Sequence, residues 1–123
     1  MLKIIFSEQG EPISDFVAKE TAREVIEKYL KDSSKEEIDV EIHVCNEVYL
    51  ESFVLHTMRK VIPQEKIEFY MRDTKFIYDD VTGLVFPDNV EPEFIFASLV
   101  EEAIQAGYNN LQERRKQDEN MGG

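Results

Sequence analysis

The chain of 123 residues is poor in several residue types that specific chemistries require. Its one cysteine, Cys45, excludes an internal disulfide framework and fits a reducing compartment. Its five glycines are scattered, so the glycine-rich phosphate loops of dinucleotide-binding and nucleoside-triphosphate-binding proteins are missing. No apolar run approaches the roughly 18 to 20 residues of a membrane span, and residues 1–6 are too short for the apolar region of a signal peptide. These absences predict a cytoplasmic protein without a cofactor.

Positive charge is also scarce, because 26 acidic residues stand against 14 Lys and Arg and give a formal net charge of -12. This imbalance argues against direct binding to nucleic acid or to anionic membranes, and it favours a basic protein surface as partner. Between Lys75 and Arg114 the chain has no Lys or Arg. The acidic residues of that span that we predict to bind the partner are Asp79, Asp80, Asp88, Glu91, Glu93, Glu101 and Glu102. A solvated acidic face without a partner is the alternative interpretation.

Residues 38–62 are predicted to form one strand followed by one helix, and the rest of the chain is organised around this unit. Apolar and polar residues alternate over 38–45, which is typical of a strand with one apolar and one polar face. Asn46 is predicted to cap the helix through its side-chain oxygen, and Pro63 to end it. Apolar residues recur at helical spacing between these two positions. The residues predicted to lie on or beside the opposite face are Glu51, Arg59 and Lys60.

The same two periodicities predict the remaining elements. In chain order they are a strand at 2–7, a helix from Ser14, a strand at 66–72, short strands at 75–78 and 84–86 around a turn at 79–83, and a helix from Pro92. Residues 114–123 have no apolar periodicity, so a frayed helix end and a mobile polar tail are expected there. We therefore predict a single α/β domain over 1–113, with a parallel β-α-β-α-β core, an antiparallel hairpin and a C-terminal helix.

The polar residues of the central strand bear on the architecture. A parallel strand covered on both faces is apolar almost throughout, but this strand carries Asp39, Glu41 and His43. The helices are therefore predicted to lie mainly on one face of the sheet. The second face, which Ile5, Tyr70 and Tyr78 are expected to share, would be a surface for a homodimer or for another partner. The residues predicted for that second face thus mix aromatic, aliphatic and charged side chains.

A small-ligand site is the alternative to a protein-binding surface, and its expected place is where the parallel strands end. The residues predicted to line it are His43, Cys45, Asn46 and Arg72. Cys45 stands beside the amino end of a helix, a position that favours a reactive thiolate, although a lone cysteine is more often a small core residue. No metal site is expected, because structural zinc takes about four ligands and His43 and Cys45 supply only two. Asp79 and Asp80 are metal-ligand types as well, but Asp is common at turns.

One resemblance rests on three stretches, VEIHVCNEVYLESFVLHTMRK, IPQEKIEFYM and KFIYDDVTGLVFP. Over about residues 40–104 the order of features resembles the carboxy-terminal part of ABC-class ATPases of the overcoming-lysogenisation-defect kind. Their ATP site is not implied, because the phosphate loop has no counterpart here and the switch histidine would fall at Cys45. The resemblance implies an ATPase-dead fragment that binds another subunit.

Together these features predict a small acidic non-enzymatic interaction protein that regulates or inhibits a basic protein partner, in phage-host conflict or another nucleic-acid pathway. A nucleic-acid mimic, whose carboxylates imitate the phosphate array, is a special case of this prediction. The alternatives are a small-molecule-binding protein or enzyme with its site at the strand ends, and a purely structural subunit.

Overall fold

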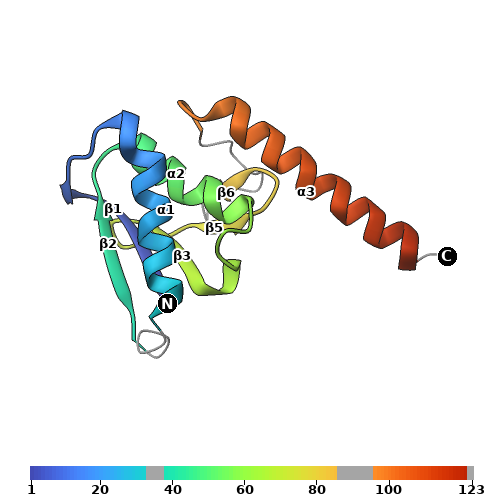
Figure 1. Ribbon diagram of the computed structural model, residues 1–123, viewed down its shortest axis with the longest axis horizontal. Coiled ribbons are helices and arrows are strands. Elements are labelled where there is room, and N and C mark those ends of the chain that lie inside the picture. Colours follow the sequence, from blue (N-terminus) through green and yellow to red (C-terminus); the bar gives the residue numbers. More distant parts are fainter. Residues whose placement is uncertain (33–37, 86–95, 122–123) are drawn as a thin grey trace.

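A four-stranded sheet with helices on one face forms the body of the protein (Figure 1). The computed structural model describes residues 1–32, 38–85 and 96–121, with side chains up to residue 118. The elements in chain order are β1 (Leu2–Glu11), α1 (Asp15–Lys31), β2 (Val40–Val44), α2 (Glu47–Met58), a 3-10 turn η2 (Gln64–Lys66), β3 (Ile67–Met71), β4 (Thr74–Lys75), β5 (Ile77–Asp79), β6 (Gly83–Val85) and α3 (Val100–Met121).

The order of strands in the sheet is β2-β1-β3-β4, with β1 parallel to both of its neighbours and β4 antiparallel to β3. Leu2 of β1 lies opposite Val40 of β2 and Ile67 of β3, so the apolar residues of the three parallel strands share one face. Leu2 and Ile4 are fully buried there. Strands β5 and β6 form a separate antiparallel pair. The predicted α/β class, with its parallel core, hairpin and C-terminal helix, is confirmed.

The helices α1 and α2 cover the apolar face of the sheet, as the polar residues of β2 predicted (Figure 1). The opposite face is polar: the ammonium group of Lys3 lies 3.0 Å from the carboxylate of Asp39, and the Tyr70 hydroxyl donates to Glu68 at 2.9 Å. Tyr78 does not share this face. Its ring stacks on Phe69, with centroids 6.3 Å apart, and packs against the core. The homodimer predicted for the polar face stays a prediction.

Helix α2 ends earlier and starts differently than its sequence suggested. It ends at Met58 rather than at Pro63, because Lys60 adopts a left-handed conformation (φ 63°). The amide of Lys60 donates to the Thr57 carbonyl at 3.0 Å, and the amide of Val61 donates to the His56 carbonyl at 2.9 Å. This pair of hydrogen bonds is the Schellman motif, which ends helices. At the other end, the side chain of Asn46 makes no capping bond. It donates instead to the Ile13 carbonyl at 3.0 Å.

Strand β1 continues through residues 8–11, four residues beyond its predicted end at residue 7. Its register with β2 shifts after Phe6, and Glu11 returns to the same partner, Val44. Gly10 permits this return, since a Cβ atom there would lie 2.6 Å from the backbone nitrogen of Cys45. The end of β1 therefore closes on the end of β2, just before α1 begins behind its N-cap residue Ser14.

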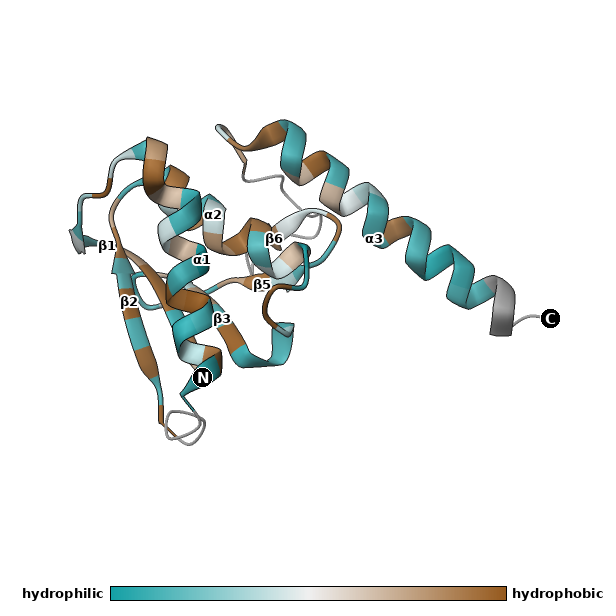
Figure 2. Ribbon diagram, viewed as in Figure 1, coloured by the Kyte–Doolittle hydropathy of each residue, from teal (hydrophilic) through white to brown (hydrophobic). Residues whose placement is uncertain are grey.

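Helix α3 begins at Val100 and continues to Met121. The predicted start, Pro92, lies outside the described residues, and residues 96–99 are not helical. Residues 114–121 continue the helix where a frayed end was expected, because Gln, Glu, Arg and Lys are good helix formers even without an apolar stripe. The mobility expected of this polar segment stays a prediction. Figure 2 shows this half of α3 as mostly hydrophilic where it extends beyond the sheet. None of the helices in the described ranges is long and apolar enough to span a membrane.

Candidate functional site

A groove of about 750 Å³ lies where the three parallel strands end. Its lining residues are Phe6, Ser7, Glu8, Cys45, Met71, Arg72, Asp73 and Thr74. Three chain segments far apart in the sequence converge here because the carboxyl ends of parallel strands meet at one edge of the sheet. The groove therefore lies at the place predicted for a small ligand.

Apolar, charged and thiol side chains line this groove together. Arg72 is the positive group, but its guanidinium lies 3.1 Å from the carboxylate of Glu8, and both side chains are exposed. The backbone of Arg72 is left-handed (φ 55°), and its amide donates to the Phe6 carbonyl at 3.1 Å. Cys45 is a half-buried free thiol. The groove thus offers an apolar wall, one thiol and one neutralised guanidinium.

The four residues predicted for the ligand site do not all meet. Cys45 and Arg72 line the groove together. His43 instead lies on the polar sheet face, where its Nδ1 is 3.0 Å from the Ser7 hydroxyl. Asn46 turns toward the start of α1. Within the described ranges, no three His, Cys, Asp or Glu side chains are grouped as metal ligands.

Three of the predicted acidic partner-binding residues are held by contacts within the chain. Asp79 accepts the amides of Val81 and Thr82 at 2.8 and 2.9 Å, and these bonds lower its pKa although burial alone would raise it. Asp80 pairs with Arg114. The residues Asp88, Glu91 and Glu93 lie outside the described part of the chain.

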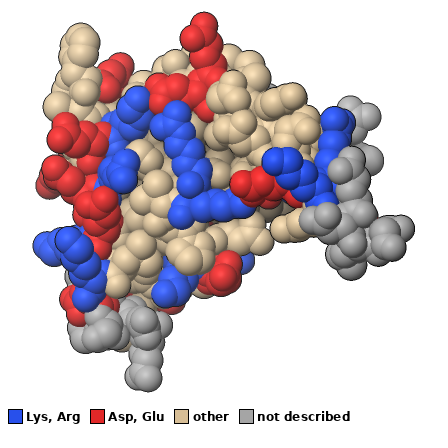
Figure 3. All heavy atoms as spheres, turned by 45° about the vertical axis from the view of Figure 1, so that its right-hand side comes forward, with Lys and Arg blue, Asp and Glu red and all other residues tan. Residues whose placement is uncertain are grey.

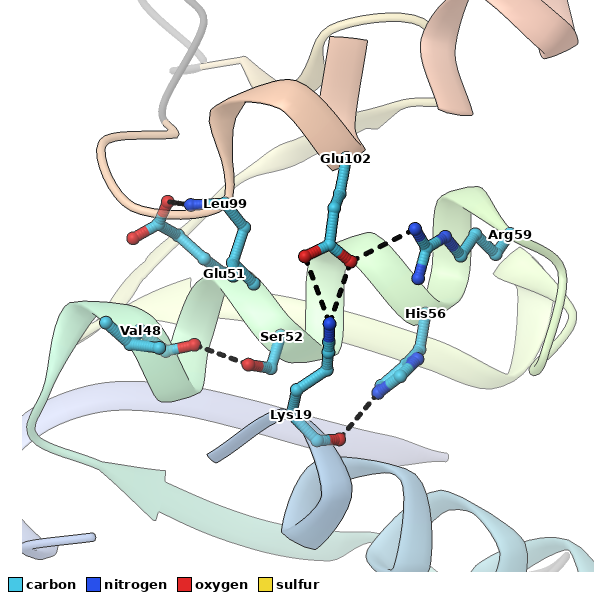
Figure 4. Close-up of polar contacts among 8 residues, drawn as sticks. All are labelled: Lys19, Val48, Glu51, Ser52, His56, Arg59, Leu99 and Glu102. Atoms are coloured by element: carbon cyan, nitrogen blue, oxygen red, sulfur yellow. Dashed lines mark hydrogen bonds and ion pairs between the residues drawn. The ribbon is translucent and has the colours of Figure 1, made fainter. Parts of the chain in front are cut away.

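Glu102 is the third of these occupied carboxylates, and it joins all three helices (Figure 4). From α3 it accepts two hydrogen bonds from the Lys19 ammonium group of α1, at 2.9 and 3.0 Å. The guanidinium of Arg59, at the end of α2, lies 3.1 Å away. The Lys19 bond is the main cause that lowers the pKa of Glu102. Glu101 remains exposed and without an ion pair among the described residues.

The face on which Asp80 and Glu102 form their ion pairs is not uniformly acidic. Figure 3 shows positive and negative side chains lying next to one another across it. Partners separated widely in the sequence produce this neutralisation, so the Lys- and Arg-free span between residues 75 and 114 gave no sign of it. A basic partner would have to displace these intramolecular pairs in order to bind there.

Helix α2 carries a row of buried polar side chains, of which the sequence analysis placed only Glu51, and placed it differently (Figure 4). Glu51, expected near the outer face, is 2% exposed. Its Oε1 atom accepts the amides of Ala97, Ser98 and Leu99 at 2.8, 3.0 and 3.3 Å, directly before α3. His56 is also buried, with Nε2 2.7 Å from the Lys19 carbonyl, and burial lowers its pKa. This row fixes α1 and α3 to α2, a structural role.

The most exposed large apolar side chain of the described residues is Phe16, at 99% exposure in the first turn of α1. The amino end of α2 lies beside it, since Asn46 at the start of α2 donates to the carboxylate of Asp15 at 3.3 Å. We call this region the Phe16 surface, and it consists of Glu11, Asp15, Phe16, Glu20 and Glu47, all of them exposed. Sequence reasoning missed it. The available signal was that Phe16 lies off the buried stripe of α1, which runs through Ala18, Ala22, Ile26 and Tyr29.

The chain matches no family model, no curated protein and no solved structure.

Proposed function

We propose that the protein is a non-enzymatic interaction module that binds a basic protein partner through the Phe16 surface. The observation that supports this proposal is the exposed Phe16 side chain with carboxylates on every flanking segment. Large aromatic residues that stand in solvent within a charged rim are typical of protein-binding surfaces. Burying one phenylalanine in a partner stabilises a complex by about 1.5–3 kcal/mol.

The charges around Phe16 favour a basic partner over an acidic or neutral one. Lys19 is the nearest basic residue along α1, and its ammonium group is already bound to Glu102. Asp15 and Glu47 occupy the first turns of α1 and α2, where the helix dipole stabilises negative charge. Apart from the hydrogen bond that Asp15 accepts from Asn46, the carboxylates of this surface are therefore available to a partner, and the net charge of -12 extends their attraction at low ionic strength.

Binding of this kind would allow the protein to regulate or inhibit its partner by covering a basic surface. Where that surface otherwise binds nucleic acid, the exposed carboxylates would compete with phosphate groups. The acidic residues between Lys75 and Arg114 contribute less to this proposal than their sequence suggested, because Asp79, Asp80 and Glu102 are engaged within the chain.

Affinity capture from the native cell extract tests the proposal when it compares three baits. The wild-type chain is compared with Phe16→Ser and with a matched control, Ile77→Ser, whose side chain is also apolar and exposed (55%). We expect the wild type and the control to enrich the same basic protein, and Phe16→Ser to lose it. An identical set of proteins on all three baits would overturn the proposal, as would no enrichment on the wild type.

A small-ligand site is the second candidate, because Cys45 and Arg72 line one groove at the strand ends. Thermal denaturation of the protein in the presence of a library of small organic acids tests it. A ligand of this site raises the melting temperature of the wild type but not of Cys45→Ser or Arg72→Ala. If no compound stabilises the wild type, or if both variants respond equally, the groove is not a binding site for this class.

A further inference from the structure

Helix α3 turns its small residues inward and its large apolar residues outward. The buried positions of its first half are Ala103, Ala106, Gly107 and Asn110. By contrast, Ile104 is 57% exposed and Tyr108 is 56% exposed, while Leu111 is half-buried. Their exposure leaves an apolar stripe without a cover among the described elements.

The outward residues follow the spacing of a helix-pairing surface. Ile104, Tyr108 and Leu111 are separated by four and three residues, the alternation that keeps side chains on one seam of two paired helices. Glu101 precedes the stripe and Arg115 follows it at the same alternation. We call these five residues the α3 stripe. It carries a carboxylate at one end and a guanidinium at the other, and neither has an ion-pair partner within the described ranges.

We propose that the α3 stripe pairs with the α3 stripe of a second copy of this chain, in antiparallel orientation about a two-fold axis at Tyr108. Glu101 and Arg115 both lie seven residues from Tyr108, on opposite sides of it. An antiparallel pair centred there brings Glu101 of each copy opposite Arg115 of the other. A parallel pair would place like charges together at both ends of the stripe, and like charges oppose association.

The position of α3 leaves room for such a pairing. The helix lies at the periphery of the domain, and its second half extends away from the sheet (Figure 1). A single helix pair buries less than the roughly 800 Å² per partner of a standard interface, so the dimer is expected to be weak and dependent on concentration. The α3 stripe shares no residue with the polar sheet face or with the Phe16 surface, so this inference does not rest on the proposed function.

Sedimentation equilibrium over a wide range of protein concentrations tests the proposal. The mass of the wild type should rise from the 14.4 kDa of the monomer toward twice that value. Ile104→Glu and Tyr108→Glu should each hold the protein at the monomer mass, with helicity by circular dichroism showing that they fold. The matched control Ile77→Glu should dimerise like the wild type, because Ile77 is equally exposed but lies on β5.

Charge reversal distinguishes this pairing from a non-specific apolar contact. Arg115→Glu should weaken the dimer about ten-fold or more, because the substitution places a carboxylate opposite Glu101 at both ends of the helix pair, and these like charges repel. The double variant Glu101→Arg, Arg115→Glu should restore dimerisation. A wild type that stays at 14.4 kDa at every concentration would overturn the proposal. So would a double variant no better than Arg115→Glu, or a dimer that Tyr70→Ala on the sheet face abolishes while Tyr108→Glu leaves it intact.

Discussion

Replacing Gly107 by alanine tests how α3 is seated on the domain, since two physical effects of this change have opposite signs. Within a helix, alanine is more favourable than glycine by about 0.8–1 kcal/mol. In the folded protein, however, the added Cβ atom would lie 2.1 Å from the carbonyl oxygen of Val81 and 3.1 Å from its carbonyl carbon. Real Cβ atoms essentially never lie closer than 3.0 Å to such neighbours. Because the obstacle is backbone, α3 has to move away from the turn by about 1 Å.

The displacement also weakens the contacts of Asn110. Asn110, one turn further along, donates to the Met58 carbonyl at 2.9 Å and to the Asp80 carbonyl at 2.6 Å, in a site where it is 5% exposed. Overpacking costs about 1–3 kcal/mol, and stretched buried hydrogen bonds cost about 1–3 kcal/mol more. After subtracting the gain in helix propensity, we expect a net loss of about 3 kcal/mol, within a range of about 1–5 kcal/mol. For a chain of this size a loss of about 3 kcal/mol corresponds to a fall in Tm of roughly 9–15 °C.

Urea and thermal unfolding followed by circular dichroism measure the effect. The matched control is Asn109→Ala, an exposed position of the same helix, where the gain in propensity is offset only by the loss of one exposed hydrogen bond from the Gln105 side chain (2.9 Å), so that stability changes by less than about 0.5 kcal/mol. A Gly107→Ala protein that is as stable as the wild type, or more stable, would show that α3 is not seated against Val81 as described.

Three further variants probe the helix ends and the buried polar row. Lys60→Gly should raise the unfolding free energy by about 0.5–1 kcal/mol, because glycine adopts the left-handed backbone at this helix end without strain, and a lower urea midpoint would contradict it. Asn110→Ala should lower stability by about 2 kcal/mol, since it leaves two carbonyls without their donor; a loss below about 0.5 kcal/mol would refute this clamp. Burial holds the pKa of His56 below its ordinary 6.5, so the unfolded chain takes up the proton first and stability should fall as pH drops below 6.5. In His56→Gln the stability should no longer change with pH in this range, and an unchanged slope would show that His56 is not its cause. A second loss of stability should begin below pH 4.5. Lys19 is the main cause that lowers the pKa of Glu102 in the folded protein, so the unfolded chain takes up this proton first as the pH falls.

Periodicity was enough to predict the elements that carry the fold. The alternation over residues 38–45 identified β2 and its polar face, and from that face the one-sided placement of the helices followed. The helix ends were less predictable, because they depend on atoms that are distant in sequence. The side chain of Asn46 donates to the Ile13 carbonyl just before α1 instead of capping α2. The left-handed backbone of Lys60 ends α2 before Pro63.

The candidate sites likewise divide into a predictable part and an unpredictable part. That Cys45 and Arg72 line one groove was predictable, because parallel strands end at one edge of the sheet. The pairing of Glu102 with Lys19 was not, since only the packing of α3 across α2 brings these side chains together. The inward face of α3 was less predictable, because a periodicity argument favours large residues at a helix contact. Gly107 shows instead that close backbone approach required small ones.

Titration of the captured basic partner with the purified protein, in low and high salt, measures both the apolar and the electrostatic part of the proposed binding. We expect Phe16→Ser to weaken binding about ten-fold or more at either salt concentration, since it removes about 1.5–3 kcal/mol of apolar burial. We also expect binding of the wild type to weaken steeply as salt is added, because exposed carboxylates supply the attraction. Binding that is indifferent to both Phe16 and salt would show that the Phe16 surface does not bind the partner.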